Sequence, residues 1–338
     1  MRHGTASTIM RNRAAGKGIF FIMLLLDFIN VGNGDSILIR EMRGDTLCYA
    51  LLVDCGHYAL VRDDHPQEPD PRSKRIFAGE FLQKCGVNHL DMLLLTHFHR
   101  DHAGGLGRVL DTADVEQLAT TYVPPAGYPS LHPDADNELP TAARNVLRCM
   151  DFFTSALREH PGKVHGFLEW RGDHTESLAL TEELSMDVYF TGRGVYEDQR
   201  RIFDAAFRGE RNRYDLMHWS RFMNVSSLRQ RLFYHGKEIV LGGDTYGVLW
   251  DRDSTMPCDI LKLPHHGSVS SATAKFLRQL QPKTIVVSVA GGRPDGYPNP
   301  AIIAMLKEFT DDIRFTDAVD IPGLVQPVFH ESVHMEIP

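Results

Sequence analysis

The chain has 338 residues, of which 43% are apolar and 24% are charged. This composition is typical of a folded globular protein and excludes a disordered or fibrous one. The formal net charge of −8 argues against a surface built as a whole to hold nucleic acid, although it leaves room for a local basic patch. Five cysteines stand far apart and never as C-x-x-C, which predicts reduced thiols in a cytoplasmic protein.

The N-terminal residues are expected to lie outside the fold. The longest apolar run, Ile19 to Leu26, ends at Asp27 and is far shorter than the ~20 residues that cross a bilayer. It follows basic residues, as in a secretory signal, but no small-residue cleavage site comes after it. We therefore predict a flexible extension over residues 1–18, one domain over residues 19–338, and no membrane association.

Strand and helix patterns alternate along that domain. Val61–Arg72 is rich in Pro and Asp and is predicted to be a loop. In chain order, strands are predicted at Phe20–Asn30, Ser36–Glu41, Cys48–Asp54, Asp91–Thr96, Val115–Val123, Gly166–Trp170, Met186–Thr191, Gln230–Tyr234, Glu238–Gly242, Ile260–Leu263 and Thr284–Ala290. Helices are predicted at Ser73–Cys85, Ala142–His160, Ala272–Leu280 and Ala301–Phe309, with a helical insertion over residues 193–222. This order predicts a layered α/β architecture, with two sheets and helices outside them.

The strongest chemical signal follows the strand that ends at Thr96, where residues 97–102 read H-x-H-x-D-H. In extended backbone alternate side chains face the same way, so His97 and His99 can hold one cation together. Where the strand turns, Asp101 and His102 can reach a second cation. Imidazole and carboxylate suit zinc, manganese or iron, and three histidines within six residues are hard to explain as surface residues.

This motif resembles the signature of the metallo-β-lactamase superfamily and, more narrowly, of the metallo-β-lactamase-like domain of the competence protein ComEC. Other landmarks of that domain occur along the chain in matching order. Residues 28–36, F-I-N-V-G-N-G-D-S, resemble its D-V-G-Q-G-D opening but depart from it with Asn30 and Asn33. Its L-I-D-x-G turn is matched at 52–56, its G-D at 241–244, its P-H-H-G-S at 263–268, and its closing pairs at Asn299-Pro300 and Thr316-Asp317. The resemblance runs from about Asp27 to Asp320. It implies a four-layer αββα sandwich with two divalent ions, zinc or manganese.

The resemblance also implies roles for residues in the second half of the chain. Asp244 should bridge both ions, and His265 should ligate the second. Spacing alone does not decide between His265 and His266; we assign His265 to the metal and His266 to the substrate, as a phosphate contact or proton donor. With Asp101, His266 is a candidate catalytic residue.

Three further residues are candidates for supporting roles. Asn224 and Ser268, together with His266, are predicted to contact substrate. Asp54 is expected to hold the second ring nitrogen of a ligand histidine, although an ordinary turn aspartate explains its position equally well.

One position departs from the superfamily pattern. Many members carry a further histidine between the first cluster and the bridging aspartate, whereas residues 224–228 here read N-V-S-S-L, as in the ComEC-like group. The first ion would then have fewer protein ligands and bind weakly. His218 could replace the missing ligand, but a structural or surface role is the better expectation.

The predicted reaction class is hydrolysis by a metal-bound hydroxide. Two cations about 3.5–4 Å apart lower the pKa of a bridging water and stabilise the attacking and leaving oxygens. The sequence contains no G-x-S-x-G elbow and no Walker-type loop. ComEC-like domains are associated with cutting DNA, so analogy favours a phosphodiesterase or nuclease, with DNA or another phosphodiester as partner. The alternatives are a hydrolase of small phosphoesters or other small esters, a di-iron oxidoreductase, and a non-catalytic partner protein.

The insertion offers modest support for nucleic-acid binding. Residues 193–231 contain nine arginines, five acids and several aromatics. Arginine interleaved with aromatics suits a phosphate backbone with stacked bases. An amphipathic helix with a solvated basic face and buried aromatics explains the pattern slightly better.

Overall fold

The computed structural model describes residues 21–32, 34–60, 72–135, 138–170, 172, 175–251, 256–291, 297–319, 321 and 330–338. The predicted extension over residues 1–18, Asn33, and nearly all of the predicted Val61–Arg72 loop lie outside these residues.

Two sheets, each with seven strands in the described part of the chain, form the centre of the fold. The first has the order β14-β1-β2-β3-β4-β5-β6 and the second the order β13-β12-β11-β10-β9-β8-β7. The first sheet consists of β1 (Ile22–Ile29), β2 (Ile37–Arg43), β3 (Thr46–Val53), β4 (His89–Leu94), β5 (Asp114–Thr120), β6 (Val164–Glu169) and β14 (Ser332–Ile337). The second consists of β7 (Glu176–Ala179), β8 (Leu184–Tyr189), β9 (Arg229–Tyr234), β10 (Lys237–Leu241), β11 (Ile260–Lys262), β12 (Thr284–Val287) and β13 (Ile313–Phe315).

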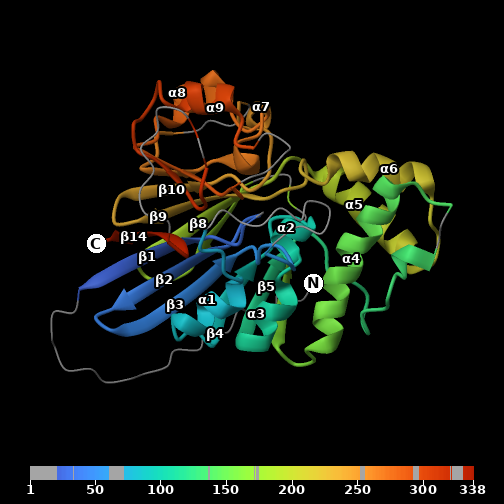
Figure 1. The fold of residues 1–338 in the computed structure, drawn as a ribbon. Helices are drawn as coiled ribbons and strands as arrows, with labels where there is room; N and C mark the ends of the chain where they lie inside the picture. The colour runs from blue at the N-terminus through green and yellow to red at the C-terminus, as the bar shows by residue number, and fades with distance from the viewer. Residues whose placement is uncertain are drawn as a thin grey trace, which may run out of the picture.

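Helices cover the outer face of each sheet, which gives four layers (Figure 1). At the top of Figure 1, the second sheet is covered by α7 (Gly247–Trp250), α8 (Ala274–Leu280) and α9 (Pro300–Leu306). The helices on the side of the first sheet are α1 (Ala78–Lys84), α2 (Arg100–Ala103), α3 (Leu106–Thr112), α4 (Thr141–Glu159), α5 (Arg193–Phe207) and α6 (Arg213–Phe222). The structure therefore confirms the αββα sandwich.

The layers follow from the alternation of side chains along each strand. In β3, Leu51 and Val53 pack in the cluster between the sheets, whereas Ala50 and Leu52 pack in the cluster beneath the helices. Because successive side chains of a strand point to opposite faces, an apolar run such as β3 is buried on both sides. A third cluster fills the space between the second sheet and its helices.

Some element boundaries differ from the predictions. The helix expected from Ser73 begins at Ala78, and the insertion is two helices, α5 and α6, rather than one segment. β14 was not predicted; it completes the edge of the first sheet by pairing antiparallel with β1. Among the described residues, no helix is long and apolar enough to cross a membrane.

Candidate metal centre

The candidate ligands lie where neighbouring strands of both sheets end. Strands β3 and β4 run parallel, as do β10 and β11, so their carboxyl ends meet at one edge. Asp54 follows β3, Asp244 follows β10 after two residues, and His265 and His266 follow β11. The H-x-H-x-D-H segment follows β4 and runs into α2.

Asp54 fixes the start of this segment. Its Oδ1 accepts a hydrogen bond from the Thr96 amide at 2.8 Å, and its Oδ2 accepts one from Nδ1 of His102 at 2.7 Å. Both Asp54 and His102 are buried. The contact that the sequence suggested for Asp54 is therefore present, and it turns Nε2 of His102 away from Asp54.

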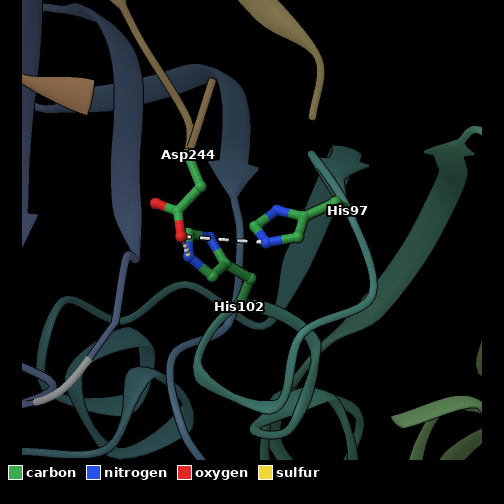
Figure 2. A group of neighbouring side chains, drawn as sticks. All are labelled: His97, His102 and Asp244. Carbon is green, nitrogen blue, oxygen red and sulfur yellow. Dashed lines mark ion pairs between the residues drawn. The ribbon is translucent and has the colours of Figure 1, made fainter. Parts of the chain in front are cut away.

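The Asp244 carboxylate faces two histidines of the motif, His97 and His102 (Figure 2). Its Oδ2 is 3.3 Å from Nε2 of His102 and 3.9 Å from Nε2 of His97. The turn that delivers this carboxylate needs a glycine at position 243, where φ is +52° and an added Cβ would lie 2.4 Å from the Ser227 hydroxyl. The structure thus places the Asp244 carboxylate beside both histidines, and its bridging role stays a prediction from the resemblance.

His266, and not His265, joins this group. Nε2 of His266 lies 3.3 Å from Oδ1 of Asp244 and 3.7 Å from Oδ2 of Asp101, while its Nδ1 donates to the Ser288 carbonyl at 3.0 Å. Both histidines have left-handed backbone, with φ of 47° and 53°, so the extended geometry assumed for this pair is wrong. The geometry favours exchanging the two roles assigned from sequence.

His265 instead faces the pocket beside the centre. Its Nε2 accepts a hydrogen bond from Nδ2 of Asn224 at 3.1 Å, and its Nδ1 lies 2.9 Å from the Ser268 hydroxyl. Asn224 and His265 both line the pocket. Ser268 does not line it and orients His265 from behind.

His99 lies beside His97 but, among the described residues, belongs to none of the groups whose atoms lie close enough to share one ion. Its Nδ1 lies 3.0 Å from Nε2 of His97, and the ion that the two histidines were expected to share stays a prediction. His218, the substitute ligand considered from the sequence, stacks on Phe222 with ring centroids 4.4 Å apart and belongs to none of the described ligand groups.

The residues fit a pair of divalent ions. Three buried atoms that converge on the centre have no hydrogen-bond partner among the described residues: Nε2 of His102, Nε2 of His266 and Oδ1 of Asp244. Leaving such atoms unpaired costs about 1–3 kcal/mol each, and a bound cation would satisfy them. Among the described residues, the groups whose ligand atoms lie within 4.8 Å of one another include His97–His102–Asp244, Asp101–His102–His266 and Asp35–Asp244–His266.

Metal binding requires neutral imidazole and ionised carboxylate, which the surroundings of His97 and Asp244 favour. Burial, reinforced by the charges of His102 and His99, lowers the pKa of His97 well below its usual value. Burial would raise the pKa of Asp244, but the neighbouring His266 and His102 hold it well below the usual range. Burial would also lower the pKa of His102, but Asp244 and Asp54 raise it well above its usual value, so an ion would have to displace the proton of that ring.

Asp35 and Lys262 form a buried ion pair beneath the centre that the sequence reasoning missed. Lys262 Nζ donates to Oδ2 of Asp35 and also to the Gly243 carbonyl at 3.3 Å. Oδ1 of Asp35 lies 3.7 Å from Nδ1 of His266. The sequence feature that could have pointed to Asp35 is the Gly34-Asp35 turn. Position 34 requires glycine, because an added Cβ would lie 1.8 Å from the Asp101 carbonyl oxygen.

A pocket of about 650 Å³ opens over the centre. Its floor contains Asp101, Asp244 and His266, and its wall includes one face of α4. The pocket lining also contains Tyr58, Arg100 and Arg148, none of which the sequence singled out.

The arginines of the insertion are largely engaged with acids. Arg193 pairs with Glu197, Arg201 with Asp198 and Asp215, and Arg208 with Glu210. The aromatics Tyr196, Phe203 and Trp219 are buried. The amphipathic explanation of this segment therefore accounts for its structure better than a nucleic-acid surface does.

Two helix-covered sheets with a histidine–aspartate cluster at their shared edge define an αββα protein with a candidate metal centre. The chain belongs to the metallo-beta-lactamase superfamily, whose family model matches residues 29–291.

Individual relatives are more distant. ComE operon protein 3 of Bacillus subtilis is 25% identical over 300 residues, which are 86% of this chain and 32% of that protein. Ribonuclease Z of Mycolicibacterium paratuberculosis is 37% identical over 98 residues, 29% of this chain and 28% of that protein. The chain thus matches about a third of either relative's length. A solved structure, the metallo-beta-lactamase fold protein YhfI from Bacillus subtilis, is 12% identical with a TM-score of 0.44 and covers 94% of this chain and all of that one.

Proposed function

We propose that this protein is a phosphodiesterase that works with two divalent ions, zinc or manganese. The observation that carries the proposal is the convergence of His102, His266 and Asp244 atoms that have no hydrogen-bond partner among the described residues, next to an open pocket that Asp244 and His266 line. One ion would be held by His97, His99 and Asp244, and the other by Asp101, His102, His266 and the shared Asp244. A donor set of imidazole and carboxylate without cysteine suits zinc or manganese.

When bound, such a pair of ions lowers the pKa of water and stabilises charge on the attacking and leaving oxygens. The protein's own residues then position the substrate. Asn224 and His265 face the pocket side by side. In our proposal they contact the phosphate, and His265 in its protonated form donates the Nε2 proton to the leaving oxygen, after which that nitrogen accepts from Asn224 as in the structure. Ser268 holds the other side of the His265 ring.

Phosphodiester substrates are favoured by the charge of the pocket and by the relatives. Once Asp101 and Asp244 hold ions, the charged side chains left in the lining, apart from histidines, are Arg100 and Arg148. Such a pocket attracts anions. The name of one relative says that it is a ribonuclease, an enzyme that cleaves phosphodiester bonds.

A hydrolase of small phosphoesters is the second candidate. A volume of about 650 Å³ falls within the range of about 300–1,000 Å³ that is usual for small-ligand pockets. We also propose a cytoplasmic location, which is supported by five free cysteines, three of them buried.

The deciding experiment compares substrates on zinc- and manganese-loaded protein. Bis(4-nitrophenyl) phosphate, 4-nitrophenyl phosphate and 4-nitrophenyl acetate share one chromophore and differ in the bond that is cut. We expect hydrolysis of the diester to exceed that of the other two, and Asp244→Ala to lose both ions and the activity. Preferential hydrolysis of the monoester by the native protein would favour the second candidate, and cleavage of the acetate alone would exclude both.

A further inference from the structure

We propose that Arg100 and Arg148 form a second anion site in the pocket, which binds a substrate phosphate other than the one being cleaved. The inference rests on the proposed phosphodiesterase function and narrows its substrate class. The preferred substrates would be nucleotide diesters that carry another phosphate on the nucleotide next to the scissile bond.

The first observation is the way α4 faces the pocket. Thr141, Asn145 and Arg148 all line it. They are spaced by four and three residues, so they lie on one face of the helix. Arg148 stands last in this row. Its Nη1 donates to Oδ1 of Asn145 at 3.0 Å, which holds the guanidinium along the wall.

Arg100 supplies the second charge from the floor. It is the first residue of α2, between His99 and Asp101, so its backbone is fixed by the metal-binding segment. The described residues form no ion pair with Arg100, and its guanidinium carbon lies 5.9 Å from the centre of the Tyr58 ring. A half-buried arginine without an acidic partner is suited to binding an anion.

The acidic partner of Arg148 does not block the site. Both Nε, at 3.2 Å, and Nη2 of Arg148 donate to Oδ1 of Asp134, whose side chain is 70% exposed. Ion pairs with such exposed carboxylates contribute little because water screens them. A phosphate in the pocket can therefore share or replace this contact, with Asn145 still orienting the guanidinium.

A neighbouring depression limits the site to one additional phosphate. This hollow of about 890 Å³ shares Tyr58, Arg100 and Arg148 with the pocket, so the two lie next to each other. Its other charged lining residues are Arg108 and His160 against the acids Asp111, Asp134, Asp151 and Glu159. A long polyanion is not favoured there, because a groove that tracks a nucleic-acid backbone is positively charged.

Aromatic rings beside the two arginines fit a nucleotide. Tyr58 stacks on Phe152 with ring centroids 4.8 Å apart and an interplanar angle of 20°. The His57 ring also packs against Tyr58, with ring centroids 4.2 Å apart. Tyr58 lines both hollows. A base adjacent to the second phosphate would meet this aromatic group.

Binding can be tested separately from catalysis. Thymidine 3′,5′-bisphosphate and thymidine 5′-monophosphate contain no diester bond, and their affinities for zinc-loaded protein can be measured by calorimetry. We expect the bisphosphate to bind roughly tenfold more tightly or better, as for a hydrogen bond between charged groups. Arg148→Ala should remove that preference, and Arg148→Lys should restore part of it.

The matched control is Arg158→Ala, which changes an exposed arginine of the same helix that bonds the Tyr128 carbonyl and lies outside both hollows. The Arg158→Ala variant should still bind the bisphosphate more tightly than the monophosphate, by the same factor as the native protein. In the activity assay, the native protein should favour the dinucleotide pdTpdT over dTpdT, and a tetranucleotide should give little further gain.

Two results would overturn the anion site: equal binding of the two nucleotides by native protein, or a preference that survives Arg148→Ala. Failure of the proposed function is distinguishable from these. If no diester is cleaved but the bisphosphate still binds more tightly in an Arg148-dependent way, the phosphodiesterase is excluded and the anion site stands.

Discussion

Nδ1 of His102 donates a 2.7 Å hydrogen bond to Oδ2 of Asp54, and Nε2 of the same ring lies 3.3 Å from Asp244. Asp54 thus determines which ring nitrogen is free for a metal ion. Carboxylates in this position orient a ligand histidine and increase its basicity. Asp54 itself is strained, with φ of 58°, which shows that the surrounding fold holds it in place.

Asp54→Ala should therefore weaken metal binding by roughly 10–100-fold. Competition with a chromophoric chelator measures this change directly. Asp27→Ala is the matched control, because Asp27 is also buried and accepts a hydrogen bond from a histidine, Nδ1 of His334, at 2.8 Å. Equal loss of metal in both variants would mean that general destabilisation, and not the orientation of His102, is responsible.

The exchange of roles between His265 and His266 gives a second prediction. His266→Ala should lower metal content, because its Nε2 is the atom near Asp101 and Asp244. His265→Ala should retain both ions and slow turnover, by roughly 10²–10⁴-fold if His265 is a general acid.

Leaving-group dependence tests the same assignment independently. A very acidic leaving group needs no proton, so the deficit of His265→Ala should shrink on such a substrate. Metal analysis showing loss from His265→Ala and retention in His266→Ala would restore the original, sequence-based assignment.

The roles of these two histidines could not be predicted from the sequence, whereas those of residues 97–102 could be proposed. The segment 97–102 could be assigned as a unit because its candidate ligands are close in sequence and follow an apolar strand. Which of His265 and His266 faces the metal centre depends on the left-handed backbone of both residues. The spacing of residues in the sequence does not indicate such a conformation. The αββα sandwich itself followed from the order of motifs, whereas β14 forms only because it pairs with β1 far away in the chain.

Charge counting alone could not decide the role of the insertion. The excess of arginines in residues 193–231 suggested a basic surface, but contacts outside the segment engage several of them. Arg200 pairs with Glu169, and Arg231 with Glu238. Conversely, Lys262 lies in an apolar strand and gave no sign of its burial or of its pairing with Asp35.

That buried pair leads to a third prediction. Lys262→Met leaves the Asp35 carboxylate buried without its cation, and removing one partner of a buried pair costs about 3–5 kcal/mol. The double variant Lys262→Met with Asp35→Asn removes both charges and should recover most of the loss. Urea unfolding in the presence of EDTA gives the free energies of unfolding without a contribution from bound metal.

The Lys262 variants also separate stability from metal binding. Because Lys262 bonds the Gly243 carbonyl next to Asp244, we expect the double variant to bind zinc less tightly than the native protein although it folds. Native-like zinc affinity in the double variant would restrict the pair to a role in stability.

The last prediction concerns the insertion and is that its exposed arginines do not bind nucleic acid. Arg201 and Arg208 are 54% and 59% exposed, and each already pairs with a carboxylate. Replacing both by alanine should leave the affinity for single-stranded DNA and its salt dependence unchanged, as measured by fluorescence anisotropy at several salt concentrations. If each arginine neutralised one phosphate, the slope of log K against log salt would fall by about 1.4. A decrease of that size, with the free energy of unfolding unaltered, would contradict this prediction and would indicate that α5 and α6 bind nucleic acid.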